Sequence, residues 1–278
     1  MLNKFVWFFA GAVLMTASCS KKTDNSNQPP KPVDEEPFVS GNLKVMTYNI
    51  HHCNPPSKGV EIDLNAVVNL IIQQKPDIIA LQEVDDHTSR SGAFNQAQEI
   101  ARKMGMDYYF GKAINYGGGA YGVAILSRFP LSETKVDFLP SETGSNAEQR
   151  VLATAKVTLP DGKAIRFGST HLDAQSSPVN RELQMTEINR IAANENLPFI
   201  IAGDFNAAPG SSVIQMLDDK FKRTCTQCDP TIPAANPTKA IDFIAFAPAN
   251  GFTVASHRVI AESYPSDHLP VVATLQYK

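Results

Sequence analysis

Eight polar side chains that are able to bind a metal ion or move a proton lie at or close to the ends of short apolar runs in the sequence. They are Asn49, Glu83, His171, Asp204, Asn206, Asp242, Asp267 and His268. Loops at strand ends collect side chains from distant segments, so we expect these residues to converge. Carboxylate, amide and imidazole groups are the ones that metal and phosphate chemistry require. The pattern therefore predicts a site for such chemistry.

Each of these residues also has a simpler interpretation when it is taken alone. Asn49 and Asn206 are of a type common in turns, and Asp204 after a glycine is typical of a loop cap. Glu83 lies in an acidic stretch that solvent exposure alone would explain. A single histidine is most often a structural residue whose hydrogen bonds are satisfied. Only the joint occurrence of these residues favours a functional site.

Short apolar runs predict the strands that must position these side chains. The expected strands cover residues 43–48, 77–81, 122–126, 164–170, 198–202, 241–246 and 270–275. Several are uninterrupted, such as Phe199-Ile200-Ile201-Ala202, and a continuous apolar run favours a strand that is covered on both faces. The segment from Val151 to Arg166 is typical of a hairpin.

Between the strands, three stretches have the spacing of amphipathic helices. Residues 64–71 and 97–104 each place apolar side chains on one face, and Gly105 is well placed to end the second helix. A third helix is expected from Pro178 to about Asn194. Strands that alternate with helices predict an α/β protein with stacked sheets and helices outside them.

Six short blocks of the sequence are informative through their order. They are MTYNI from residue 46, LQEV from 81, THL from 170, GDFN from 203, IDFI from 241 and SDHLP from 266. Each is weak alone, but together they resemble the successive signature blocks of the endonuclease/exonuclease/phosphatase family, over about residues 43–278. The resemblance implies a four-layered α/β/β/α sandwich, with two packed mixed sheets and outer helices, for a domain at residues 42–278. It also implies that the protein hydrolyses phosphate esters, with phosphodiesterase as the preferred activity.

The same resemblance implies that Asn49, Glu83 and Asp267 hold a metal ion. Hard oxygen ligands of this kind suit Mg²⁺ or Mn²⁺. A phosphodiester is a poor electrophile because its anionic oxygens repel an attacking water, so a cation on the phosphoryl group has a clear chemical purpose.

For catalysis, the resemblance implies that Asp204 polarises the attacking water and that Asn206 donates a hydrogen bond near the phosphoryl oxygens. The resemblance also pairs His268 with Asp242. The carboxylate of Asp242 would hold the His268 ring in place, and would either favour its protonated imidazolium form or let the ring act as a base. His171 would then contact the scissile phosphate or assist the leaving group.

Two arginines are further candidates for substrate binding. Arg90 and Arg150, together with Glu148, resemble polar positions of bacterial members of the family. Their planar guanidinium groups are suited to a substrate phosphate. An ion pair at the protein surface is the alternative interpretation.

The N-terminus has the order of an export signal. Lys4 precedes an apolar run over residues 5–15, and small residues follow before Cys19. The apolar run is too short to cross a bilayer as a mature helix. Small residues that end at a cysteine resemble a bacterial lipobox, although Thr16 stands where leucine is usual. We therefore expect residues 1–18 to be a lipoprotein signal peptide and Cys19 to be acylated; an ordinary cleaved signal is the alternative.

Residues 19–41 are polar and rich in proline, which predicts a flexible, semi-extended tether. With lipid at Cys19, the protein is expected to be exported and anchored to a bacterial membrane, at its periplasmic face or at the cell surface. We expect a monomer with no obligate protein partner.

The other cysteines leave several interpretations open. Export implies an oxidising compartment, so Cys225 and Cys228 could close a small disulfide loop or stay as two free thiols, and half of a metal site is the less favoured alternative. Cys53 follows His51 and His52, which resembles a ligand cluster. In an extended segment, however, neighbouring side chains point in alternate directions, which argues against a zinc site there.

The charge of the chain bears on its substrate. A formal net charge of −3 gives no general positive field for collecting nucleic acid, which weakens the case for binding extended duplexes. Nucleic acid, a phospholipid head group and a small phosphate ester all stay open as substrates. A binding lipoprotein that has the same fold without catalysis is the alternative from another functional class.

Overall fold

The structure, a computed structural model, describes residues 1–2 and 38–277. The predicted signal peptide, Cys19 and most of the predicted tether fall within residues 3–37, so these expectations lie outside the described residues. Among the residues that are described, no helix has both the length and the apolar character needed to cross a membrane.

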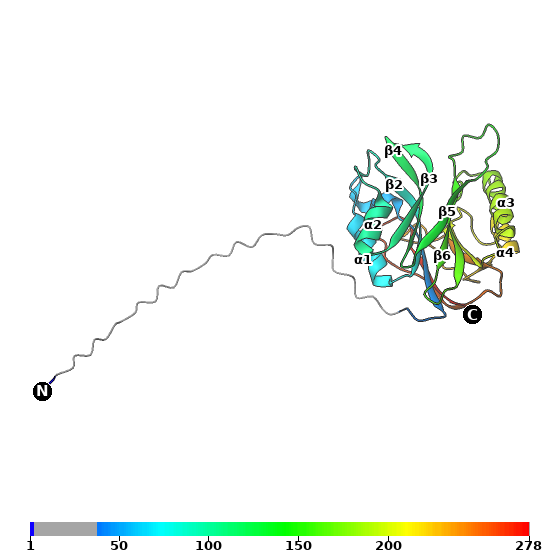
Figure 1. Cartoon of the computed structure of the whole chain (residues 1–278). Helices are drawn as coiled ribbons and strands as arrows, with labels where there is room; N and C mark the ends of the chain where they lie inside the picture. The colour runs from blue at the N-terminus through cyan, green and yellow to red at the C-terminus, as the bar shows by residue number, and fades with distance from the viewer. Residues whose placement is uncertain (3–37, 278) are drawn as a thin grey trace. The chain divides into compact units, whose positions relative to one another are not determined.

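The domain is built on two mixed sheets of six strands each (Figure 1). The first sheet has the order β11-β12-β1-β2-β4-β3, with β1 at Asn42–Asn49, β2 at Ile78–Asp86, β3 at Asp107–Tyr116, β4 at Gly119–Ser127, β11 at Phe252–Val259 and β12 at Val271–Tyr277. The second has the order β5-β6-β7-β8-β10-β9, with β5 at Leu131–Phe138, β6 at Val151–Thr158, β7 at Ala164–His171, β8 at Phe199–Asp204, β9 at Lys222–Arg223 and β10 at Asp242–Ala247. In each sheet one central pair is parallel, β1 with β2 and β7 with β8, and the other pairs are antiparallel.

The two sheets face each other across a continuous apolar core. Leu43, Val45 and Ile78 from the first sheet share this core with Phe167 and Ile200 from the second. Side chains alternate between the two faces of a strand, so the neighbouring residues point to the outer faces. Central strands are therefore covered on both sides, as their continuous apolar sequences predict.

Helices cover both outer faces (Figure 1). The helices are α1 at Leu64–Gln74 and α2 at Gln96–Met104 on the first sheet, and α3 at Val179–Ala193 and α4 at Ser212–Lys220 on the second. Asn95 caps α2 by accepting a hydrogen bond from the backbone of Gln98, and Gly105 ends this helix in the left-handed conformation. The prediction of a four-layered α/β/β/α sandwich is confirmed.

No expectation from the sequence covered β3, β5, β9, β11 or α4. β3, β5, β9 and β11 lie at sheet edges, and β5 exposes most of its side chains. An edge strand has one polar face and carries little apolar periodicity, which is the signal that identifies the central strands.

Candidate active site

The strand pairing brings three of the expected residues into register. In the second sheet, Asp204 at the end of β8 is paired with His171 on β7 and with Asp242 on β10. The sequence separates these residues by several tens of positions, and the sheet places them side by side. Their convergence follows from strand order, which a single sequence does not display.

Asn49 joins the two sheets at this end of the sandwich. Its Nδ2 donates to Oε1 of Glu83 and to Oδ2 of Asp204, both at 3.1 Å. Its Oδ1 accepts a hydrogen bond from the backbone N of His51 at 3.1 Å. Asn49 is 1% exposed, so these hydrogen bonds form away from bulk solvent, where an unpaired amide would be costly. The amide thus fixes the relative positions of two carboxylates from different sheets.

Glu83 lies inside β2 and does not follow the strand as the sequence indicated. The register of β2 against β4 shifts between Leu81 and Val84, and Glu83 within this bulge has φ of 57°. A bulge redirects a side chain out of the strand's alternation, which explains why the apolar run seemed to end at Gln82. Left-handed backbone at a residue other than glycine is strained, and such strain is concentrated at functional sites.

Asp204 is the centre of the site. Its Oδ2 lies 3.5 Å from Nε2 of His171 and 3.7 Å from Nε2 of His268. The side chain is buried, and this burial together with the negative charge of Asp242 raises the pKa of Asp204 to about 7, against the opposing effect of His268. A carboxylate with a raised pKa is suited to accept a proton.

His268 is held between two carboxylates. Its Nδ1 lies 3.0 Å from Oδ2 of Asp242, while Nε2 faces Asp204. Burial opposes protonation of the ring, but the charge and hydrogen bond of Asp242, and then the charges of Asp204 and Asp267, raise the pKa of His268 to about 10. Of the two alternatives from the sequence, this geometry favours the imidazolium.

His171 has the opposite electrostatic environment. Burial lowers the pKa of His171 well below its ordinary value, and the positive charges of Arg150 and His268 lower it further. Its ring is therefore neutral at physiological pH. Nδ1 of His171 is buried and has no hydrogen-bond partner among the described residues. The site thus contains one charged and one neutral imidazole beside the same carboxylate.

Asn206 and Asp267 lie beside this centre. The backbone N of Asn206 donates to Oδ1 of Asp204 at 2.8 Å, and its Nδ2 donates to the backbone O of Leu172 at 3.0 Å. Asp267 is linked to Asn49 through Ser266, whose Oγ donates to the backbone O of Asn49 at 2.7 Å and lies 3.4 Å from Oδ1 of Asp267. Ser266 was not singled out from the sequence, although it belongs to the block SDHLP.

The residues predicted to hold a metal ion are oxygen donors, the type that a hard divalent cation prefers. Glu83 and Asp267 supply carboxylates and Asn49 supplies an amide at one end of the sandwich. Within the described residues, Glu83 has no cationic side chain as a partner, so its charge is left for an external cation. When Mg²⁺ or Mn²⁺ is bound by such a set, these oxygens are the ligands that the ion prefers.

The two arginines differ in their surroundings. Arg90 binds the buried carboxylate of Asp85 through Nε at 2.7 Å and Nη2 at 2.9 Å, and its guanidinium stacks 4.4 Å from the ring centre of Tyr116. Arg150 is 8% exposed, and its Nη1 lies 3.0 Å from Glu148. Its Nε is buried without a partner among the described residues. The positive charge of Arg150 thus acts on His171, while Arg90 forms an ion pair with Asp85 of β2.

Thr231 is a member of the site that the sequence did not indicate. Its Oγ1 donates to Oδ2 of Asp242, the same oxygen that contacts His268, and it accepts from the backbone N of Ile241. Thr231 is 1% exposed. No pattern in the sequence distinguishes it from other threonines, because its role depends on the path of a loop.

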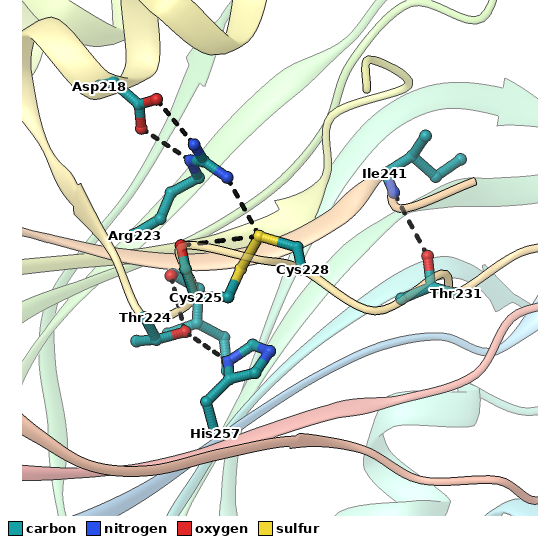
Figure 2. The surroundings of a disulfide bond; sticks show 9 residues. Asp218, Arg223, Thr224, Cys225, Cys228, Thr231, Ile241 and His257 are labelled. Atoms are coloured by element: carbon teal, nitrogen blue, oxygen red, sulfur yellow. Dashed lines mark hydrogen bonds and ion pairs between the residues drawn. A yellow bond between two sulfur atoms is a disulfide. The ribbon is translucent and has the colours of Figure 1, made fainter. Parts of the chain in front are cut away.

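That loop carries the Cys225–Cys228 disulfide, as Figure 2 shows. The disulfide interpretation from the sequence is confirmed, and the half-site for a metal is wrong because the two thiols bind each other. Arg223 pairs with Asp218 at 2.7 Å and donates to Sγ of Cys228 at 3.0 Å, which fastens the loop to the end of α4. Figure 2 also shows the hydrogen bond between Thr231 and Ile241.

The segment His51–Cys53 is not extended, contrary to the expectation from the sequence. It is a 3₁₀ turn in which all three residues have positive φ, at 45°, 43° and 59°. Cys53 is fully buried among apolar side chains, so its thiol belongs to the core. The rings of His51 and His52 lie 4.6 Å apart in a T-shaped arrangement.

Comparison with known proteins agrees with this description. The sequence profile of the "Endonuclease/Exonuclease/phosphatase family" matches residues 46–268. The chain is 26% identical over 253 residues to the uncharacterized protein YbhP of Escherichia coli K12, covering 84% of this chain and 96% of that one.

Two solved structures are also similar. The endonuclease/exonuclease/phosphatase from Beutenbergia cavernae has a TM-score of 0.71 and 26% identity, covering 85% of this chain and 72% of that one. A mannosyl-6-phosphatase of Bacteroides thetaiotaomicron has a TM-score of 0.69 and 19% identity, covering 84% of this chain and 100% of that one, which shows a shared fold.

Proposed function

Because the chain belongs to the endonuclease/exonuclease/phosphatase family, we propose that it is a hydrolase that cleaves phosphate esters with the help of a divalent metal ion. The observation that carries the proposal is the arrangement around Oδ2 of Asp204. Asn49, His171 and His268 all approach this one buried oxygen. A carboxylate in such a position is suited to orient and deprotonate a water molecule.

Glu83, Asn49 and Asp267 would hold the metal ion, which when bound neutralises phosphoryl oxygens and so favours attack on phosphorus. Asp204 accepts a proton from the attacking water as the new P–O bond forms. The ester P–O bond breaks, and the departing alkoxide takes a proton from solvent. His268, as an imidazolium, stabilises negative charge on the phosphoryl group. Asp242 keeps that ring protonated and oriented through Nδ1.

His171 and Arg150 complete the electrostatic environment of the phosphate. A neutral His171 keeps one ring nitrogen protonated, so it is able to donate a hydrogen bond without adding charge. Arg150 supplies a guanidinium from the buried side of the site, where a positive charge acts strongly on an anion. Arg90 is bound to Asp85, and we assign it a supporting part at the rim.

The substrate class stays open between nucleic acid, phospholipid head groups and small phosphate esters. The similar mannosyl-6-phosphatase acts, by its name, on a sugar phosphate, which keeps small phosphate esters among the candidates. We also propose that the protein is an exported, monomeric lipoprotein anchored through Cys19, on the strength of the signal-like sequence before that residue.

The test is hydrolysis of bis-p-nitrophenyl phosphate by the purified protein, with and without Mg²⁺, followed by a screen of DNA, RNA, sphingomyelin and inositol phosphates. Metal-dependent release of p-nitrophenol supports the proposal. A protein that hydrolyses none of these compounds with any divalent ion, while still binding one of them, is instead a binding lipoprotein on the same fold.

A further inference from the structure

We propose that His51, His52 and Glu83 form a second metal site, which takes a divalent transition-metal ion. One nitrogen from each ring and one oxygen of Glu83 all lie within 4.8 Å of one another. Ligands at about 2.1 Å from an ion are separated by at most about 4.2 Å, so closing the group on an ion requires movements of less than about 1 Å. This inference goes beyond the proposed hydrolase, and the two share only the ligand Glu83.

The backbone is what brings the two rings together. Adjacent residues of an extended strand point to opposite sides, but His51 and His52 both have left-handed backbone, at φ of 45° and 43°. The turn is anchored on both sides. The backbone N of Cys53 donates to the O of Ile50 at 2.7 Å, and Nε2 of Gln96 donates to the O of His52 at 2.6 Å. The rigid turn and the bulge at Glu83 thus aim three side chains at one point.

Each of the two rings has a nitrogen that is left for a metal ion. Nδ1 of His51 lies 2.9 Å from the backbone O of Asn54, and a carbonyl only accepts, so this nitrogen carries the proton. Nε2 of His51 then presents a lone pair, which is the usual arrangement of a metal-binding histidine with a carbonyl behind it. Nδ1 of His52 is buried and has no hydrogen-bond partner among the described residues. A buried nitrogen without a partner is suited to bind an ion that is not part of the protein.

The chemistry of the group selects the kind of ion. Two imidazoles and one carboxylate suit Mn²⁺, Fe²⁺, Co²⁺, Ni²⁺ or Zn²⁺, whereas Mg²⁺ prefers oxygen ligands. The carboxylate of Glu83 disfavours an anion at this point, which argues against a second phosphate subsite. Asn49 occupies Oε1 of Glu83, and the carboxylate has a second oxygen for the ion. Glu83 would therefore be a ligand of two metal sites, one with oxygen ligands only and one with two nitrogen ligands.

Cobalt binding by the purified, chelator-treated protein provides the test, because the visible absorption of Co²⁺ reports on imidazole ligands without any substrate. We expect His51→Ala and His52→Ala each to lower the bound Co²⁺ by one equivalent, measured by elemental analysis, and to remove its imidazole-dependent absorption. His87→Ala is the matched control: this ring belongs to the neighbouring loop, is 59% exposed and contacts Asp86. It should bind as much Co²⁺ as the wild type does.

A measurement on the unmodified protein covers the case in which a variant does not fold. In ¹H–¹⁵N spectra of the six histidine rings, Zn²⁺ should shift the ring nitrogens of His51 and His52 while His87 stays unchanged. Unshifted His51 and His52 nitrogens at saturating Zn²⁺ would overturn the proposal. Folded His51→Ala and His52→Ala variants that keep full Co²⁺ binding would also overturn it. The same holds if these variants lose only their affinity for inorganic phosphate and bind Co²⁺ as before. Because no substrate is present, failure of this site is distinct from an absence of hydrolysis.

Discussion

Nδ1 of His268 lies 3.0 Å from Oδ2 of Asp242, and both side chains are at most 5% exposed. A buried ion pair of this kind is retained only where each charge has a partner, since removal of one leaves the other unpaired away from water. Nε2 of His268 lies 3.7 Å from Oδ2 of Asp204, so the charges of the pair act directly on Asp204.

The pair makes stability depend on pH in the metal-free protein. The pKa of His268 is raised to about 10 in the folded state, against an ordinary value of 6.5, so its contribution is complete below pH 6.5 and is lost as pH rises through 10. Between these values the free energy of unfolding should fall by up to about 1.4 kcal/mol per pH unit from this group. Urea unfolding at pH 6, 8 and 10 measures it. His268→Ala should flatten the decline and His87→Ala should not; equal slopes in all three proteins would contradict the assignment.

Catalysis should depend on the same residues. Asp204→Asn and His268→Ala are each expected to lower kcat by about a hundredfold to ten-thousandfold with a smaller change in KM, because a positioned acid or base contributes about that much. Asp242→Asn should be milder, since it leaves the ring in place. Adding Asp242→Asn to His268→Ala should change little, because the two residues act through one function. If the two losses multiplied, Asp242 would act separately from the histidine.

Metal dependence is expected to follow Glu83. Excess EDTA should abolish hydrolysis, and Mg²⁺ or Mn²⁺ should restore it, because the proposed ligands are oxygens. Glu83→Gln removes one charge with little change of shape, so activity should need a higher Mg²⁺ concentration. Glu99→Gln changes a partly exposed glutamate on α2 that pairs with Arg102, and this control should titrate like the wild type. Full activity in excess chelator would exclude the metal mechanism.

The central strands were predictable from the sequence because burial on both faces leaves continuous apolar runs, as in Phe199-Ile200-Ile201-Ala202 on β8. The helix ends were predictable where a glycine such as Gly105 supplies the left-handed cap. β5 was not, because five of its eight residues are exposed and give no apolar pattern. Its place at the sheet edge is determined by its pairing with β6, and the local sequence of β5 does not predict this pairing.

Within the site, the residues at strand ends were identified by type and order, and the register of β7, β8 and β10 accounts for their meeting. The positions whose conformation was not predicted from the sequence have an unusual backbone. Glu83 was expected after its strand and lies in a bulge, and the turn at His51 was expected to be extended. Left-handed backbone at such residues is held by tertiary contacts, so the local sequence does not encode it.

Lipidation at Cys19 stays a prediction about residues outside the described range. Labelled palmitate should be incorporated into the wild-type protein and not into Cys19→Ser, because acylation requires the thiol of that residue. Cys53→Ser is a poor control since Cys53 is buried in the core, so a Ser18→Ala variant is preferable. Recovery of an unlipidated, soluble wild-type protein would support the ordinary cleaved signal.

Thr231 should act as a positioning residue for Asp242. Thr231→Val keeps the branched shape but removes the hydroxyl that donates to Oδ2 of Asp242, and Oδ1 of that carboxylate is already buried without a partner among the described residues. A lost hydrogen bond to a buried charge costs about 1.5–3 kcal/mol, so the free energy of unfolding should fall by about that amount in urea titrations. The freed carboxylate should also hold His268 less firmly, which predicts a lower kcat at unchanged KM and a displaced alkaline limb in the pH profile. Thr231→Ser retains the hydroxyl and should recover most of both losses. A valine variant with the kcat and pH profile of the wild type would mean that Thr231 only packs against the loop, whatever its effect on stability.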